Sequence, residues 1–379
     1  MVPEPVHTER MDESEIILLA LMIGDGSCVK RQPIRYASID EENLAAVGAA
    51  AAHRGVTPIR DDYPAARVRT LRLPAPYRLA RGKRNPIAAW LDKLGLFGKR
   101  SDEKFVPAEV FALPNDQVAL FLRHLWSTDG SVRWDAKMHQ GRVFYASTSR
   151  RLADDVVQLL LRMGVFAKVY RAKKAGYRDS WHVTVSGAEQ QTRFLSLVGV
   201  HGVKAVAVQE VLDGLQDVVR NPNTDTLPLE VWDRVKAAMA AQGMAQRAFA
   251  AAIGTRYCGT TLWKHAPSRA RLDRVAAVLD SVELHDLATN DVFWDRVVEI
   301  TSIGDQDVYD GTVSGTHNFV ANQISLHNSL EQDADMVMLL HRPDAFDRDD
   351  PRGGEADIIL GKHRNGPTAT ITVAHQLHL

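Results

Sequence analysis

A stretch of about a hundred residues occurs twice in this 379-residue chain, and that duplication constrains the fold more than any local pattern. The first copy opens with EIILLALMIG, which predicts a helix over Ser14–Gly26 with Ser14 as its cap. This helix is apolar around almost its whole circumference, so we expect it to be buried. A second predicted helix, DQVALFLRHLWST at Asp116–Thr128, runs into Asp-Gly as the first one does.

The segments that follow these two helices repeat in the same order. IRYASI and VRTLRL alternate apolar and polar residues, which predicts strands with one wet face, and predicted helices at Asn43–Arg54 and Pro86–Leu94 complete the first unit. SVRW, VFYAST, FAKVYRA and WHVTVSG predict the strands of the second unit, with a helix over Ser149–Met163. The sequence therefore predicts an α+β fold with two αββαββα units, residues 1–113 and 114–220 of a domain spanning 1–220.

Residues 221–290 are predicted to form a small helical region after a polar linker. The segment VWDRVKAAMAAQGMAQRAFAAAIG predicts two helices joined by a turn at Gly243. This has the size of a helix-turn-helix, with Gln246, Arg247 and Arg256 available for contacts to DNA. A plain helical spacer is an equally good interpretation.

The net charge of −1 is uninformative, but the basic residues are unevenly distributed. They gather in two strand-like regions, from Lys30 to Arg84 and from Arg133 to Arg178. A charge run is usually a solvated face, yet two basic runs in strand-like segments favour a surface for double-stranded DNA. The candidate DNA-binding residues are Arg67, Arg69, Arg72, Lys168 and Arg171.

If the two Asp-Gly helices pack side by side, Asp25 and Asp129 meet at their C-terminal ends. Two carboxylates at one point are ligands for a hard divalent cation, which positions water and stabilises the leaving oxygen in phosphodiester cleavage. An Asp-Gly pair that merely closes a helix explains one instance but not two at matching positions. Small side chains are available for a close seam: Ala20, Gly24, Ser127 and Thr128.

The phrases LLALMIGDG and LRHLWSTDG resemble the two LAGLIDADG motifs of intein-type homing endonucleases. The resemblance implies that the motif helices form the interface of two pseudo-symmetric halves and that both sheets lie on duplex DNA. It also implies that Asp25 and Asp129 hold Mg²⁺. The family's lysine before a Val/Ile-Pro step falls on Lys104, with Lys204 as its counterpart, although AVAV lacks the proline. His124 stands where the family has a small residue, which predicts a looser seam.

The segment VYDGTVSGTHNFVANQISLHNS resembles the two C-terminal blocks of an intein. Short β-type runs from Asp291 to Ile324 are compatible with this resemblance, which implies an incomplete piece of the β-rich Hint splicing fold over residues 291–328.

The chemistry of splicing explains the residue types in this segment. The side-chain amide of Asn328 can attack its own backbone carbonyl and cleave the next peptide bond, while Ser329 supplies the hydroxyl that accepts the upstream acyl group. His327 can polarise that carbonyl, and His317 and Asp310 can assist proton movement. None of these steps needs a cofactor.

From Ser329 onward, SLEQDADMVMLLHR and GEADIILGKHRNGPTATITVA resemble the last conserved stretches of a DnaB-type replicative helicase, a RecA-like hexameric ATPase. Residues 329–379 are then a fragment of the host protein. Lys362 and Arg364 fit the basic finger that reaches the nucleotide of a neighbouring subunit, although His363 departs from the usual Gln. No G-x-x-x-x-G-K-[ST] loop occurs, so we expect no ATP site in this chain.

An intact intein begins with Cys or Ser and soon shows a Thr-x-x-His block, and neither precedes the first LAGLIDADG motif. We therefore expect that the chain cannot splice alone and needs an N-terminal intein or helicase fragment in trans; the full helicase would be a homohexamer. Two alternatives to an active endonuclease stay open: a non-catalytic DNA-binding remnant, and a decayed fragment of an intein-containing helicase. Two cysteines make no disulfide framework, and no signal or membrane segment is present, so a cytoplasmic location is expected.

Overall fold

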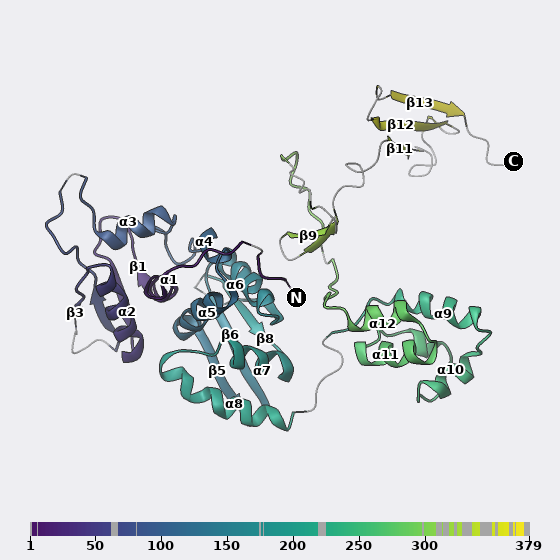
Figure 1. The fold of residues 1–379 in the computed structure, drawn as a ribbon, viewed down its shortest axis with the longest axis horizontal. Helices are drawn as coiled ribbons and strands as arrows, with labels where there is room; N and C mark the ends of the chain where they lie inside the picture. Colours follow the sequence, from purple (N-terminus) through teal and green to yellow (C-terminus); the bar gives the residue numbers. More distant parts are fainter. Residues whose placement is uncertain are drawn as a thin grey trace. The chain divides into compact units, whose positions relative to one another are not determined.

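The structure is a computed structural model and describes the following residues: 2–5, 7–61, 67–80, 82–173, 176, 178–218, 225–297, 299–307, 313, 318–321, 324–327, 336–341, 351–352, 355–363, 367 and 369–374. The chain divides into two compact units, Met1–Val298 and Glu299–Leu379, and each is described by itself. Figure 1 labels most of the helices and strands along the chain.

The first repeat consists of a buried helix, a four-stranded antiparallel sheet in the order β1-β2-β4-β3, and helices that cover one face of it. Its elements are α1 (Glu13–Gly24), β1 (Gly26–Ser27), β2 (Arg35–Ser38), α2 (Glu41–His53), β3 (Ile59–Asp61), β4 (Arg69–Arg72), α3 (Pro86–Lys93) and α4 (Ala108–Phe111).

The second repeat has the same plan, with an antiparallel sheet in the order β5-β6-β8-β7. Its elements are α5 (Asn115–Asp129), β5 (Gly130–Asp135), β6 (Gln140–Ser147), α6 (Arg150–Arg162), β7 (Ala167–Ala172), β8 (Ser180–Val185), α7 (Ala188–Leu197), η1 (Gly202–Ala205) and α8 (Val206–Gln216). The register repeats as well, because Gly26 pairs with Tyr36 and Gly130 pairs with Tyr145. The predicted pair of αββαββα-like units is confirmed.

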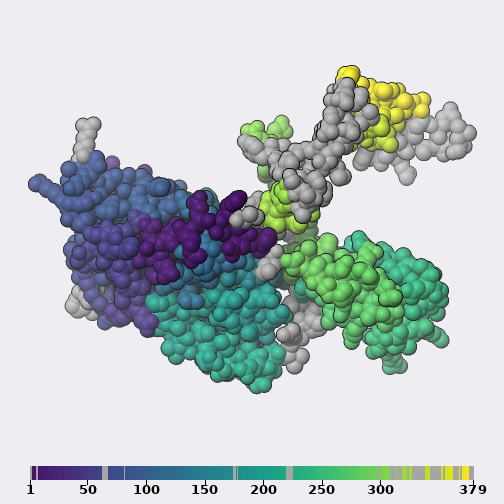
Figure 2. Space-filling view, in the orientation of Figure 1, coloured from purple at the N-terminus to yellow at the C-terminus, as the bar shows by residue number. Residues whose placement is uncertain are grey.

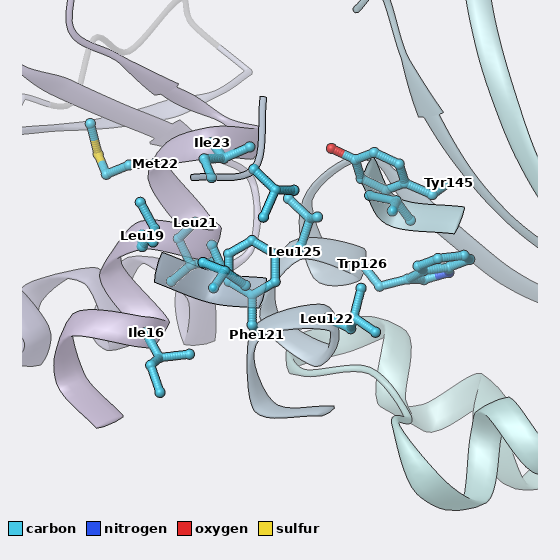
Figure 3. Packing of buried hydrophobic residues seen from close by; sticks show 14 of the residues in the cluster. Ile16, Leu19, Leu21, Met22, Ile23, Phe121, Leu122, Leu125, Trp126 and Tyr145 are labelled. Atoms are coloured by element: carbon cyan, nitrogen blue, oxygen red, sulfur yellow. The ribbon is translucent and has the colours of Figure 1, made fainter. Parts of the chain in front are cut away.

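The two repeats share one hydrophobic core, built around α1 and α5. Figure 3 shows the side chains of Ile16, Leu19 and Leu21 from α1 beside Phe121 and Leu125 from α5, and all five are fully buried. Burying a side chain of this size contributes roughly 1.5–3 kcal/mol. Both helices therefore lie inside the molecule rather than on its surface, as the all-round apolar pattern of α1 predicts.

Helix caps account for the differences between predicted and observed boundaries. Ser14 does not cap α1: the carboxylate of Asp12 accepts from the Ser14 N–H, so the helix begins one residue earlier than predicted. Asp40 caps α2 in the same way, and that helix begins at Glu41 rather than Asn43. In both cases a nearby carboxylate, a favourable partner for the positive helix N-terminus, takes the capping position.

A separate hydrophobic core holds the helical region together. Its elements are α9 (Val231–Ala241), α10 (Gln246–Ala252), η2 (Gly259–Trp263), α11 (Arg269–Val278) and α12 (Val282–Thr289). Gly243 has a φ of 61°, a left-handed conformation that favours glycine, in the turn between α9 and α10. The predicted order of helix, turn and helix is therefore present. Figure 2 shows this region, in green, as a body of closely packed side chains.

The second unit contains the hairpin β9 (Asn318–Ala321) and β10 (Ile324–His327), and the antiparallel sheet of β11 (Met336–His341), β12 (Glu355–His363) and β13 (Ala369–Ala374). The prediction of β-type runs from Asp291 was wrong for the first part of that stretch. The described residues from Asp291 to Asp307 form neither helix nor strand. A strand needs a partner edge for its backbone groups, and Ile300 and Ile303 in this stretch are 90% and 78% exposed. Among the described residues, no helix has the length and apolar character to cross a bilayer.

Candidate active site

The closest approach of α1 and α5 is at their C-terminal ends. A methyl group on Gly24 would lie 2.0 Å from Thr128 Oγ1, so the seam has no room for any side chain at this position. The Thr128 hydroxyl itself donates to the Leu125 carbonyl at 2.6 Å, which keeps it against its own helix. Asp25 and Asp129 each follow the contact residue by one position, and the tight seam thereby brings the two carboxylates together.

The predicted loosening of this seam by His124 is not found. The His124 ring packs against the ring of His201, with centroids 4.4 Å apart, in the loop before η1. Burial lowers the pKa of His124 to about 3, so the imidazole is neutral at physiological pH. The large side chain is accommodated inside the second repeat, and the contact between Gly24 and Thr128 stays close.

Asp25 and Asp129 line a cavity of about 530 Å³ at the end of the seam. Lys104 lines the same cavity. Much of the remaining wall carries hydroxyl groups, which can bind water or phosphate oxygens: Ser27, Ser101, Ser147, Thr148 and Ser180. The structure therefore brings together three of the four residues predicted for catalysis in this domain on one solvent-accessible cavity.

The two carboxylates are unfavourably placed when charged. Burial raises the pKa of Asp25 to about 6, and the negative charge of Asp129 adds to the rise, while Lys204 and Lys104 oppose it. Burial also raises the pKa of Asp129. Both residues lie at helix C-termini, the negative ends of the helix dipoles. The site concentrates negative potential, which a bound cation would offset.

Lys104 and Lys204 occupy equivalent positions in the two repeats. The Lys104 ammonium lies 2.8–3.1 Å from the carbonyl oxygens of Met22, Ile23, Gly24 and Gly26, at the end of α1. The Lys204 ammonium donates to the carbonyls of Thr128 and Gly130, at the end of α5. Each lysine therefore neutralises a helix C-terminus and holds the backbone that carries an active-site carboxylate. Lys204, the weaker of the two assignments, also contacts the end of its motif helix, although it reaches two carbonyls and Lys104 reaches four.

The lysine segments are anchored across the boundary between the repeats. Ser149, the cap of α6 in the second repeat, donates its hydroxyl to the Lys104 carbonyl at 2.6 Å. Asp40, the cap of α2 in the first repeat, accepts from the Val203 N–H at 2.9 Å, next to Lys204. The lysine of each repeat is thus positioned by a cap residue of the other.

A repeated sequence signal marks these cap residues, although our sequence reasoning missed it. Tyr-Ala-Ser stands two residues before each cap, as YASID in the first repeat and YASTS in the second. In both, the serine hydroxyl accepts from the backbone N–H of the cap residue, Ser38 for Asp40 and Ser147 for Ser149. Burial and the nearby carboxylates raise the pKa of both tyrosines, so the phenol groups of Tyr36 and Tyr145 stay neutral.

The donor set fits a hard divalent cation. Carboxylate oxygens are the ligands that Mg²⁺ prefers, and the side chains of Asp25 and Asp129 provide such oxygens. Within the described ranges, no group of three or more His, Cys, Asp and Glu side chains that could hold a metal occurs. The protein therefore offers a partial coordination shell, which water and a phosphate oxygen of the substrate would complete.

Strand alternation separates the predicted DNA-binding arginines of the first sheet. Residues two apart share a face, so Arg69 lies on the side of buried Leu71, where it is ion-paired with Glu41 of α2. Arg72 lies on the opposite, open side together with Arg35, its cross-strand partner. Arg67 precedes β4 and is exposed.

The second sheet divides its residues in the same way. Arg171 shares the face of Val169 and Val183, and it pairs with Asp179. Lys168, with its partner Thr184, lies on the open face, as does exposed Arg133 of β5. Arg35 and Arg133 were not among the predicted contacts; parity with the buried residues of their strands would have identified them.

The residues predicted for splicing mostly lie outside the described residues: this holds for Asp310, His317, Asn328 and Ser329. His327 ends β10, and its backbone pairs with Asn318. In the predicted helicase finger, Lys362 lies on β12, where its backbone pairs with Val337, whereas Arg364 is outside the described part.

Comparison with known proteins gives two family matches. Residues 116–199 match the LAGLIDADG-like domain, and residues 320–379 match the DnaB-like helicase C terminal domain. Among solved structures, the chain is similar to the crystal structure of I-DmoI in complex with DNA and Mn. The two sequences are 15% identical. That similarity covers 50% of this chain and 99% of I-DmoI with a TM-score of 0.34, which by itself identifies no fold.

Three curated relatives differ in how much of the chain they share. The replicative DNA helicase DnaB of Nostoc sp. is 41% identical over 375 residues, which is 96% of this chain and 42% of the relative. DnaB of Mycobacterium leprae is 88% identical over 51 residues, 14% of this chain. Protein RecA of Mycobacterium tuberculosis is 27% identical over 338 residues, 82% of this chain and 41% of the relative. The chain spans about two fifths of the length of the first and the third.

Proposed function

We propose that this chain, in which a LAGLIDADG homing endonuclease domain is joined to a C-terminal segment of a DnaB-type helicase, is the later part of a DnaB intein that makes metal-dependent double-strand cuts in DNA. The observation that carries the proposal is the convergence of Asp25 and Asp129 at the ends of α1 and α5. Buried carboxylates with raised pKa values are stabilised in their charged form by a cation.

In this proposal the carboxylates and the lysines of the site have different roles in cleavage. Asp25 and Asp129 would hold Mg²⁺, which positions a water molecule and stabilises charge on the phosphate as the water oxygen bonds to phosphorus and one backbone P–O bond breaks. Lys104 and Lys204 hold the helix ends and supply positive charge near the developing anion. One carboxylate from each repeat and two sheets with the same strand order suit a duplex, whose two strands are related by a twofold axis.

The comparisons support an inserted element. Most of this chain matches a DnaB protein, and most of it also matches a RecA protein. Such a segment, present in two different host proteins, is what an inserted element would produce. The 51-residue match to a mycobacterial DnaB has the same length as the stretch from Ser329 to Leu379. We therefore propose Asn328 and Ser329 as the splice junction, with Asn328 cyclisation assisted by His327, His317 and Asp310.

The test of the endonuclease is cutting of a plasmid that carries the uninterrupted helicase gene. With Mg²⁺ the purified chain should linearise this plasmid, and chelation by EDTA should abolish cutting. The same gene with the intein sequence in place should stay intact, because the recognition site is then split. Binding to the uninterrupted gene without any cutting in Mg²⁺ or Mn²⁺ would contradict the proposal and favour a DNA-binding remnant.

A further inference from the structure

One stretch of the helical region contains no acidic residue. Between Gln242 and Leu272 there are five Lys and Arg residues and not one Asp or Glu, in a chain whose acids and bases are otherwise almost balanced. We name these residues the acid-free segment. It includes α10, η2 and the loop between them. A segment of this kind carries a positive potential that opposite charges on its own surface do not cancel.

The five cations of the acid-free segment fall into two groups. Arg269 and Arg271 are engaged within the region: Arg269 pairs with Asp225, and the Arg271 guanidinium lies over the Trp232 ring. Arg247, Arg256 and Lys264 are exposed and have no ion-pair partner among the described residues. The outward-facing charges are therefore available to an external anion.

The segment that presents these charges packs against the core of the helical region. Leu262 and Phe249 are buried in the core of the helical region, and Trp263 packs against Trp232 and Phe249. The Trp232 indole donates to the His265 carbonyl at 2.8 Å, which fixes the end of η2. The Arg247 guanidinium lies 5.5 Å from the Tyr257 ring, so the start of α10 and the following loop meet. Preorganised cations lose less entropy on binding than mobile ones.

We propose that the acid-free segment is a second binding site for duplex DNA, in which Arg247, Arg256 and Lys264 contact phosphates beyond the stretch covered by the two sheets. Charge complementarity identifies the occupant, since a duplex presents a regular row of phosphates to such cations. Neighbouring exposed polar groups, on Gln246, Thr260 and Thr261, are of the kinds that bond to phosphates and base edges. This inference rests on the proposed function for which DNA is bound, namely the insertion site. The positively charged surface itself does not depend on the proposed function.

The test compares two charge-matched double variants of the full chain, each in an Asp25→Asn background so that the DNA stays uncut. Arg247→Gln with Arg256→Gln removes two cations of the acid-free segment. Arg234→Gln with Lys236→Gln removes two cations that pair with Glu283 and Asp233 on the same helical region. Affinity for a 60-base-pair duplex spanning the insertion site is measured over a range of salt concentrations. An Arg247→Lys, Arg256→Lys variant and thermal melts report whether the fold is intact.

The first variant should lower the slope of log affinity against log salt by about two, the contribution of two lost phosphate contacts. The control should keep the parent slope, and the lysine variant should restore it. Equal slopes for the first variant and the control would overturn the proposal. Cutting of a short duplex by chains with Asp25 intact tests the endonuclease separately, because that substrate contains only the stretch under the sheets.

Discussion

At the scale of single residues, the site places two carboxylates where the negative charge of each is unfavourable unless a cation is bound. Asp25 and Asp129 are close enough to interact, both lie at helix C-termini, and burial disfavours the charge on each. The positive charges of Lys204 and Lys104 offset part of the resulting rise in pKa. The arrangement is unfavourable without a cation, and a bound divalent cation would offset the negative charge of the two carboxylates.

This conflict predicts a pH-dependent gain in stability on neutralising Asp25. Its pKa in the fold, about 6, is above the value of 3.8 that we take for the unfolded chain, so the metal-free fold loses stability as pH rises from about 4 to about 6. In EDTA, Asp25→Asn should stabilise the endonuclease domain by about 2–3 kcal/mol at pH 8 and by almost nothing at pH 4. Thermal melts at the two pH values measure this, with exposed Asp213→Asn as control. A gain of the same size at both values would show that charge is not the cause.

At the scale of elements, the alternation of strand residues decides which arginines lie on the open faces of the sheets, the faces that we propose contact DNA. Arg35 on β2 and Arg133 on β5 lie on the open faces, whereas Arg69 on β4 and Arg171 on β7 lie on the faces that carry the core. All four are exposed, so accessibility alone does not distinguish them.

The face of the sheet should therefore determine the effect on DNA affinity. Arg35→Gln with Arg133→Gln should lower the salt slope of binding by about two. Arg69→Gln with Arg171→Gln removes the same charge from the covered faces and should leave the slope near the parent value. Filter binding or fluorescence anisotropy over a salt series measures both. If the second pair lowered the slope as much as the first, the covered faces would have to be part of the DNA surface.

The sequence could predict the helices and strands better than their caps and the hydrogen bonds that join distant elements. Period-two and all-round apolar patterns identified the strands and α1, and the duplication identified their order. The cap Asp12 was missed because Ser14 is a residue of capping type as well, and only tertiary structure decides between such neighbours. The start of α2 was predicted at Asn43, with no cap assigned, whereas Asp40 caps this helix. The ties from Ser149 to Lys104 and from Asp40 to Val203 join residues 45 and 163 positions apart, beyond the reach of any local pattern.

At the scale of the whole molecule, a LAGLIDADG-like domain, a helical region and the proposed splice junction follow one another in one chain. The proposed junction makes its own prediction, because in that proposal the Asn328 side chain acts as the nucleophile that releases the downstream segment. In a protein that also contains the upstream intein blocks, Asn328→Ala should prevent release of the residues from Ser329 onward, and Ser329→Ala should prevent ligation but permit release. Intact-mass measurement distinguishes them; release from the Asn328→Ala protein at the parent rate would attribute cleavage to ordinary proteolysis.

The central claim is that Asp25 and Asp129 form one metal-dependent active site, and the single-turnover rate of DNA cutting tests it most directly. Asp25→Asn and Asp129→Asn should each lower that rate by a factor of about 100 to 1,000, since removing a group that stabilises developing charge costs about 2.7–4 kcal/mol. Binding of the uncut duplex should change little, because the arginines of the open faces are separate from the carboxylates. Cutting at the parent rate by either variant would contradict the account.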